Sequence, residues 1–286
     1  MRSGFVGLAG RPNVGKSTLV NALCGEKVAI VSDKPQTTRH RVRGVVEDEG
    51  AQLVLVDLPG FQRPRDALTE RMQRTVEESL ADVDAVCLVL AANEQIGRGD
   101  RFVAARAFAG ARPVVIALNK VDRLRPAEIA AQIERAAALG DFHALHPVSA
   151  RTGDGVAALR DELLSLLPEG PALFPEGART DTPLELRVAE LVREKALHLT
   201  REEIPHAITV EVNEVTERRV SADLLVETQS QKQIVVGKGG AVIREIGTRA
   251  RPEVEALLGR PIFLELRVKV RPKWRRDEQL LDRLGI

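Results

Sequence analysis

The 286-residue sequence predicts two domains: an α/β domain with a mostly parallel sheet over residues 1–168, and an α+β domain over residues 184–286. In the first domain, short apolar segments alternate with segments of helical periodicity, a pattern typical of parallel sheets. In the second domain the order is one helix, two strands, two helices and a final strand. Residues 168–183 contain four prolines and two glycines, so residues 169–183 are predicted to form a linker between the domains.

The predicted strands of the first domain are short and apolar, and most end at polar or glycine-containing turns. They cover residues 5–8, 42–47, 52–56, 85–90, 114–118 and 144–148. The predicted helices carry apolar residues at helical spacing and cover residues 18–24, 71–81, 101–108, 127–139 and 156–167. A sheet of this kind has helices on both faces and binds its ligand where the strands end.

The second domain is predicted from a different succession of periodicities. The expected helices cover residues 184–199, 231–236 and 241–258, and the expected strands cover residues 206–214, 220–227 and 262–270. Pro252 lies inside the longest helix, where loss of a backbone donor predicts a kink or a break. Trp274, the only tryptophan, fits two roles equally well: stacking on a nucleic-acid base or closing the core of the domain.

A phosphate-binding loop is predicted at residues 10–17, which read GRPNVGKS and match GxxxxGKS between a strand and a helix. Such a loop turns its backbone N–H groups toward the phosphates of a nucleotide. Lys16 is expected to contact the β- and γ-phosphate oxygens, and Ser17 is expected to ligate Mg²⁺. The other residues expected around the phosphates are Gly10, Asn13, Val14, Gly15 and Thr18. The sequence therefore predicts a P-loop domain that binds a nucleoside triphosphate with magnesium.

The base is predicted from NKVD at residues 119–122, directly after a strand. Asp122 offers two acceptor oxygens to the N1–H and the exocyclic amine of guanine, whereas adenine would leave a buried carboxylate unpaired. This disfavours an ATP-dependent kinase. Asn119 is expected to tie this loop to the phosphate loop, and the aliphatic part of Lys120 to cover the base. After the next strand come Ser149, Ala150 and Arg151, of which the Ala150 N–H is expected to donate to guanine O6.

Two further segments are predicted to respond to the γ-phosphate. Both residues of interest in the first segment belong to DLPG, residues 57–60. Asp57 is expected to hold Mg²⁺ through water, and the Gly60 N–H is expected to sense the γ-phosphate. Thr37 and Thr38 are both candidates for the hydroxyl ligand of Mg²⁺ in a switch loop, and Thr38 is favoured. The predicted catalytic residues are therefore Lys16, Thr38, Asp57 and Gly60. The predicted metal ligands are Ser17, Thr38 and Asp57.

Composition indicates in which cellular compartment the protein is found. No apolar run approaches the roughly 18 residues of a membrane-spanning helix, and no secretory signal precedes the first strand. Cys24 and Cys87 lie in apolar segments, as reduced core cysteines do. The five histidines show no spacing typical of a zinc site. These observations predict a cytoplasmic protein.

The five nucleotide motifs occur, over residues 5–165, in the order found in translation-factor-like GTPases, which they resemble. In the second domain, Gly237, Lys238, Gly239 and Gly240 resemble the Gly-x-x-Gly loop of a type II KH domain, which binds single-stranded nucleic acid. Lys238 and the N–H groups at the start of the following helix are expected to face its phosphates, and Arg244 is expected to belong to the same RNA-binding site. A GxxG sequence is a weak signal alone, and the order of elements around it supports the interpretation.

Charge supports nucleic-acid binding locally. The chain as a whole has 42 basic and 41 acidic residues, but residues 232–276 contain 12 Lys or Arg against 4 Asp or Glu, a net charge of 12 − 4 = +8. Phosphates that pair with such residues release counterions and give salt-dependent binding. The alternative is a solvated basic surface without a partner.

A GTPase domain followed by a type II KH domain resembles the Era family, and the resemblance covers nearly the whole chain. It implies a GTPase that uses GTP/GDP and Mg²⁺. Asn13 also resembles the asparagine that coordinates K⁺ in related GTPases, and the alternative is an asparagine that only satisfies the backbone of its own loop. The family resemblance also implies binding to the 3′ end of small-subunit ribosomal RNA and to the 30S subunit precursor, peripheral association with the inner face of the cell membrane, and a monomer. The alternative is a regulatory GTPase whose C-terminal domain docks protein or membrane partners.

Hydrolysis is expected to be slow. Phe61 follows DLPG, where many GTPases have a glutamine that positions the attacking water, and a phenyl ring can neither donate nor accept. Four arginines of the predicted switch loops are minor candidates for contacts with the phosphates. They are Arg39, Arg41, Arg63 and Arg65.

Overall fold

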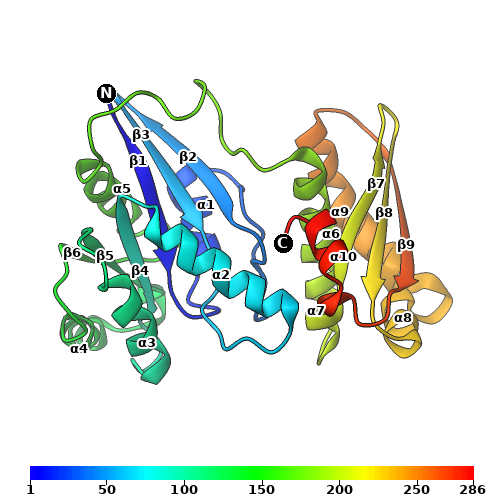
Figure 1. Cartoon of the computed structure of the whole chain (residues 1–286), viewed down its shortest axis with the longest axis horizontal. Helices are drawn as coiled ribbons and strands as arrows, with labels where there is room; N and C mark the ends of the chain where they lie inside the picture. Colours follow the sequence, from blue (N-terminus) through cyan, green and yellow to red (C-terminus); the bar gives the residue numbers. More distant parts are fainter. The chain divides into compact units, whose positions relative to one another are not determined.

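The computed structural model describes all residues, 1–286, and divides into two compact units (Figure 1). The first unit comprises Met1–Val31, Thr38–Pro64 and Thr69–Asp181, and the second comprises Ser32–Thr37, Arg65–Leu68 and Thr182–Ile286. Each unit has its own sheet and its own hydrophobic core.

The first unit contains a six-stranded sheet in the order β2-β3-β1-β4-β5-β6. Its strands are β1 (Arg2–Ala9), β2 (Val42–Asp48), β3 (Ala51–Asp57), β4 (Ala85–Ala91), β5 (Val114–Asn119) and β6 (Ala144–Pro147). Only the β2–β3 pair is antiparallel, and the other four pairs are parallel. The prediction of a mostly parallel sheet is confirmed.

Helices cover both faces of this sheet, as Figure 1 shows. On one face lie α1 (Lys16–Cys24) and α5 (Val156–Ser165), and on the other lie α2 (Ala67–Ala81), α3 (Arg98–Ala107) and α4 (Pro126–Ala137). The short 3-10 helix η1 (Val121–Arg123) follows β5. Alternation along β1 produces the two cores: Val6 and Leu8 belong to the α1/α5 side, and Phe5 and Ala9 to the other. This arrangement leaves the carboxyl ends of the parallel strands free for a ligand.

Every predicted element of the first domain is present, with shifted ends. The largest shift is at α2, which begins at Ala67 rather than near residue 71. Leu68 and Met72 are buried at a spacing of four with Val76 and Leu80, so the apolar stripe starts one turn earlier than predicted. Cys24 and Cys87 are free thiols, and burial raises the pKa of each to about 12.

Residues 168–181, here named the strap, belong to the first unit although they have almost no regular structure. The Ser3 N–H donates to the carbonyl of Pro168 at 3.0 Å, and the Val45 N–H donates to the carbonyl of Arg179 at 2.9 Å. The Gln52 side chain accepts from the N–H groups of Leu173 and Phe174 and donates to the Phe174 carbonyl. Proline and glycine prevent a helix or strand here, but they do not prevent a fixed path along the unit. Most of the predicted linker is therefore packed chain.

The second unit is an α+β fold with a three-stranded sheet in the order β7-β8-β9. Its strands are β7 (Thr209–Val215), β8 (Arg219–Val226) and β9 (Phe263–Val270), and its helices are α6 (Leu184–Leu199), α7 (Ile204–Ala207), α8 (Gln229–Val236), α9 (Ala241–Leu258) and α10 (Glu278–Arg283), with 3-10 turns η2 (Lys238–Gly240) and η3 (Trp274–Arg276). β8 pairs antiparallel with β7 and parallel with β9. Helices α6 and α9 contribute to the same core cluster as all three strands.

Three details of this unit differ from the sequence-based expectations or decide between them. Residue 206, expected in a strand, lies in α7, whose first turn contains Pro205. Pro252 does not break α9, because Ile246, Ala250 and Val254 are all buried at a spacing of four and hold the helix on both sides of it. Trp274 is completely buried and its Nε1–H donates to the Ala207 carbonyl at 2.7 Å, so it closes the core and does not stack on a base.

No helix of the structure has the length and hydropathy that crossing a bilayer requires.

Candidate functional site

The phosphate loop connects β1 to α1, and its shape requires glycine at both ends. A side chain at Gly10 would place Cβ 2.7 Å from the Val89 carbonyl oxygen, and one at Gly15 would place it 2.3 Å from Asn119 Nδ2. Gly15 has φ 99°, and Asn13 also has a left-handed backbone, with φ 65°. The loop thus turns back on itself before Lys16, and its N–H groups and the first turn of α1, with half-buried Thr18, lie at the end of the sheet.

Lys16 is almost fully buried, with 6% of its surface exposed. Its Nζ donates to the carbonyls of Gly10 at 3.2 Å and Arg11 at 3.1 Å. Burial lowers the pKa of the ammonium to about 8, and the charge of Asp57 offsets part of the shift. A phosphate beside Nζ would stabilise the charged form, so the site is prepared for an anion.

The next group of residues brings three side-chain oxygens together from three segments. Ser17 Oγ donates to Asp57 Oδ2 at 2.6 Å, and Thr38 Oγ1 donates to the same oxygen at 3.2 Å. The two hydroxyl oxygens are 2.9 Å apart. Thr37 is turned elsewhere, because its Oγ1 donates to the Lys34 carbonyl at 2.6 Å. Between the two candidate threonines, the geometry favours Thr38.

These oxygens fit a magnesium ion. Asp57 is completely buried, and its other carboxylate oxygen, Oδ1, has no hydrogen-bond partner. Burial raises the pKa of this carboxyl, against the opposing effects of Lys16, Ser17 and Thr38. An unpaired buried carboxylate is costly, and a hard divalent cation with hydroxyl and carboxylate ligands removes that cost.

The DLPG segment approaches the phosphate loop closely. A Cβ at Gly60 would lie 2.8 Å from the Pro12 backbone nitrogen, so no larger residue fits there. Phe61 is buried and packs edge to face on Phe102, with ring centroids 6.2 Å apart. The side chain after DLPG is therefore part of the core of the unit and offers no polar atom to a water molecule. Of the four switch-loop arginines, Arg39 is buried and the other three are exposed.

Asn119 ties three segments together at the ends of β1, β5 and β6. Its Nδ2 donates to the Val14 carbonyl at 3.0 Å, and its Oδ1 accepts from the N–H groups of Lys120 at 2.8 Å and Ala150 at 3.0 Å. The Lys120 Nζ donates to the Asn13 carbonyl at 2.5 Å. Because Asn119 uses the Ala150 N–H in this structure, donation to guanine O6 requires that bond to be shared or exchanged, and it stays a prediction.

Asp122 is held in place by the loop after β6. Its Oδ1 accepts from Ser149 Oγ at 2.8 Å, and its Oδ2 lies 3.8 Å from Arg151 Nε. The side chain is 12% exposed. One hydroxyl therefore fixes the orientation of the carboxylate while leaving acceptor capacity for a base with two donors.

The second candidate site lies in the second unit, at the turn between α8 and α9. Gly237, Gly239 and Gly240 all have left-handed backbones, with φ of 73°, 60° and 78°. A Cβ at Gly237 would lie 2.6 Å from Val242 Cγ2, whereas nothing lies within 4 Å of the Cβ position at Gly239 or Gly240. The turn therefore presents open backbone and the exposed Lys238 to a ligand.

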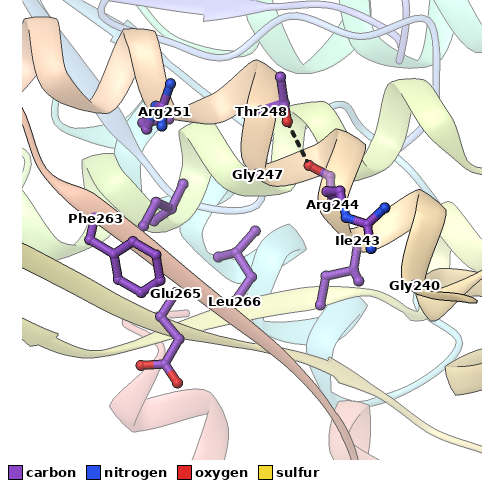
Figure 2. Close-up of a pocket in the computed structure, with 10 residues that line it drawn as sticks. Gly240, Ile243, Arg244, Gly247, Thr248, Arg251, Phe263, Glu265 and Leu266 are labelled. Atoms are coloured by element: carbon purple, nitrogen blue, oxygen red, sulfur yellow. Dashed lines mark hydrogen bonds between the residues drawn. The ribbon is translucent and has the colours of Figure 1, made fainter.

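A groove of about 480 Å³ runs from this turn between α9 and β9 (Figure 2). Its apolar lining comes from Ile243, Leu264 and Leu266. Gly247 brings the helix close to the strand, since its Cβ position is 3.6 Å from Leu266 Cδ1. Arg244, Thr248 and Arg251 line the helix side. An apolar wall for bases beside cationic groups for phosphates suits a single-stranded nucleic acid.

The prediction from sequence included Gly240 and Arg244 but missed the rest of the groove. The missed lining residues are Ile243, Gly247, Thr248, Arg251, Phe263, Leu264, Glu265 and Leu266. A signal was present in the helix, because residues 240, 244, 247, 248 and 251 repeat at intervals of three or four and lie on one face. The strand side had no comparable signal, since pairing of α9 with β9 is a tertiary contact.

Two different family models match the two units of the chain. Residues 5–120 match the family model described as 50S ribosome-binding GTPase, and residues 203–275 match the KH domain family. GTPase Era of a Nocardioides species is 47% identical over 300 residues, which cover 99% of this chain and 96% of that protein. GTPase Era of a Mycobacterium species is 47% identical over 294 residues, covering 99% and 98%. The chain belongs to the Era family of GTPases.

Two solved Era structures match this Era-family chain over its full length. Aquifex aeolicus Era, a variant bound to GDP and AlF4⁻, is 38% identical with a TM-score of 0.95, and the match covers 100% of this chain and 99% of that one. Era in complex with MgGDPNP and nucleotides 1506–1542 of 16S ribosomal RNA is also 38% identical, with a TM-score of 0.94 and the same coverage. The predicted family and fold class, a P-loop GTPase domain followed by a KH domain, are confirmed.

Proposed function

We propose that this protein is a GTP-hydrolysing switch whose nucleotide state controls its affinity for the 3′ end of 16S ribosomal RNA during assembly of the small ribosomal subunit. The observation that carries the proposal is the presence of two prepared sites in one chain. The first is the buried cluster of Ser17, Thr38 and Asp57. The second is the open glycine turn that leads into the α9–β9 groove. Era relatives bind MgGDPNP and a 16S fragment together.

In the nucleotide site, each residue has a role that follows from its position. Lys16 exchanges its two loop carbonyls for β- and γ-phosphate oxygens. With nucleotide bound, Ser17 and Thr38 would turn their hydroxyl oxygens from Asp57 to Mg²⁺, and Asp57 would hold the ion through water. The ion would supply positive charge against the phosphate oxygens. The Gly60 N–H donates to the γ-phosphate, and because Thr38 and Gly60 both depend on that group, both switch loops respond to its loss.

The base contacts give selectivity for guanine. Asp122, oriented by Ser149, accepts from the two donors on the guanine edge, and the Lys120 side chain covers the ring. Arg151 stays near the second oxygen of Asp122. Adenine would face the carboxylate without those donors and would leave it unpaired, so ATP binds poorly.

Hydrolysis without an activator is slow because Phe61 is buried against Phe102 and cannot position water. We propose that Asn13, in the phosphate loop, would hold K⁺, which would add positive charge beside the phosphates. Turnover in K⁺ buffer is then expected to exceed turnover in Na⁺ buffer.

In the RNA site, Gly237, Gly239 and Gly240 let the backbone of the strand approach, and Lys238 and Arg244 pair with its phosphates. The bases lie in the groove against apolar side chains. β9 is the edge strand of its sheet, and its Phe263 N–H is used by the neighbouring strand. In a parallel ladder the next residue then turns its N–H and C=O to the open edge, where base edges can bind them.

Three further assignments rest on family resemblance: the 30S precursor as the physiological partner, a monomeric state, and peripheral association with the inner face of the cell membrane from the cytoplasm. Light scattering tests the second and vesicle flotation the third. The competing function, docking of a protein or membrane partner through the second unit, requires the glycine turn to be only a helix connection.

The decisive experiment is RNA affinity of the full-length protein. A fluorescent single-stranded RNA with the sequence of the 16S 3′ end is titrated with protein bound to GDPNP or to GDP. Gly239→Asp and Lys238→Asp are expected to weaken binding at least about tenfold by repelling phosphates. Gly285→Asp is the matched control, because Gly285 also has positive φ, 73°, and open space at its Cβ position. Equal affinity in both nucleotide states, or full affinity of both loop variants, would contradict the proposal.

A further inference from the structure

The α9–β9 groove extends well beyond the glycine turn. Eleven residues separate Gly240 from Arg251, and at about 1.5 Å per residue this part of α9 is about 16 Å long. A Gly-x-x-Gly loop clamps about four nucleotides. Figure 2 shows Arg251 and Phe263 at the end of the groove away from Gly240. This end therefore lies where the RNA strand continues past the nucleotides held by the turn.

Phe263 is exposed without any role in packing. It is the most exposed large hydrophobic side chain of the protein, at 65%, and it belongs to neither core cluster of its unit. The neighbours Leu264 and Leu266 are partly buried against the core clusters, whereas Phe263 lines the same groove and keeps its ring exposed. A free aromatic ring beside a basic groove is the arrangement on which unpaired bases stack.

The charges around Phe263 favour a polyanion. Glu265, the one acidic group lining the groove, accepts from Arg219 Nη2 and Arg267 Nη2 at 2.5 Å each. The hydrogen bond from Arg267 and the charge of Arg219 lower its pKa, so it stays ionised and paired. Arg251 has only a loose contact, 3.8 Å, between its Nε and Glu255. Two guanidinium groups thus neutralise one carboxylate, and Arg251 is available to a phosphate.

We propose that Phe263 stacks on a base at the far end of the groove and that Arg251 contacts the adjoining phosphate. This subsite rests on the proposed RNA-binding function and extends it, because it makes affinity depend on strand length. Every base has a π-face, so stacking adds affinity without selecting a sequence. The glycine turn determines where the RNA enters the groove, and Phe263 determines how many nucleotides of the RNA are bound.

The test compares two RNAs from the 16S 3′ end, one of about four nucleotides, which the turn alone accommodates, and one of about ten. Phe263→Leu keeps an apolar side chain but removes the π-face. It is expected to bind the longer RNA about 5- to 100-fold more weakly than the unmodified protein and the shorter RNA equally well. Phe263→Tyr is expected to retain full affinity. Leu184→Ala, which shortens another exposed apolar side chain of the second unit outside the groove, is the control.

A structural role for Phe263 predicts different results. If the loss arose from misfolding, binding of both RNAs would weaken and Phe263→Leu would unfold at a lower temperature than the unmodified protein. Equal binding of the longer RNA by Phe263→Leu and the unmodified protein overturns the stacking subsite, while a persisting loss in Gly239→Asp leaves the RNA-binding function standing. Full affinity of Gly239→Asp for both RNAs overturns the function, and the subsite with it.

Discussion

Single residues in the nucleotide site are held in states that only a ligand relieves. Lys16 is charged but surrounded by carbonyls, and Asp57 is buried with one oxygen unpaired. Such groups weaken the folded state of the empty protein and are found mostly at functional sites. The proposed binding of phosphate to Lys16 and of Mg²⁺ to Asp57 would offset this cost.

The two neighbouring threonines provide a direct test of the metal site. Thr38→Ala is expected to lower the rate of GTP hydrolysis and the affinity for GTP with Mg²⁺, each about 10- to 100-fold. The reason is that it removes the Mg²⁺ ligand that only the triphosphate state requires. Thr37→Ala is the control, since its hydroxyl bonds the Lys34 carbonyl. Measuring the rate of GTP hydrolysis at increasing Mg²⁺ concentrations distinguishes the two variants. Equal effects of the two changes would argue against Thr38 as the ligand.

Lys16 makes the stability of the nucleotide-free protein depend on pH. Its pKa is about 8 in the folded protein against an ordinary value of 10.5, so between these values the unfolded chain binds more protons and raising the pH stabilises the fold. Below pH 8 the side chain is charged in both the folded and the unfolded protein and the full penalty applies, on the order of 3 kcal/mol. Lys16→Met removes it.

Urea unfolding of the two proteins without nucleotide measures this effect. Lys16→Met is expected to be more stable than the unmodified protein at pH 7, with the difference shrinking as pH rises from 8 toward 10. Comparing the two proteins cancels other groups that titrate in this range. A difference that did not change with pH would refute the assignment.

At the scale of elements, most of the fold was predictable because local periodicity and burial agree. The strands that end at Ala9, Asp57 and Asn119 are buried over most of their length, and the motif at the end of each one is local in sequence. α2 and the strap were misjudged for opposite reasons. The start of α2 was placed too late because Leu68 continues the apolar stripe across a polar segment. The strap was predicted to be a linker because its hydrogen-bond partner, Gln52, lies more than a hundred residues away in the sequence.

The strap gives a prediction about stability. Gln52→Leu leaves the N–H groups of Leu173 and Phe174 without their acceptor, and is expected to cost about 1 to 3 kcal/mol in the unfolding of the first unit. It should also speed proteolysis within residues 168–181. Gln73→Leu, which removes only an exposed contact with Glu77, is expected to change neither. Unaltered proteolysis of Gln52→Leu would mean that this amide does not hold the strap.

For the whole molecule, the proposed switch requires coupling between the two sites. Linkage makes that coupling reciprocal: if GDPNP changes RNA affinity relative to GDP by some factor, RNA changes the GDPNP-to-GDP affinity ratio by the same factor. Typical couplings are about 5- to 150-fold. Titration of fluorescent GDPNP and GDP with and without RNA measures it. In Gly239→Asp, nucleotide affinities should remain and the effect of RNA should vanish. Coupling absent in both directions would leave two independent modules.

Local sequence was enough to predict the chemistry of this protein: a loop for phosphates, a carboxylate for guanine and glycines that would admit an RNA backbone. Each of these depends on residues close together in the chain, whose spacing fixes local geometry. Only the folded chain shows that Thr38 rather than Thr37 meets Asp57, that Trp274 is core, and that Phe263 remains exposed beside Arg251. These outcomes depend on contacts between distant segments, and such contacts are selected by burial and packing of the whole unit, which no local pattern records.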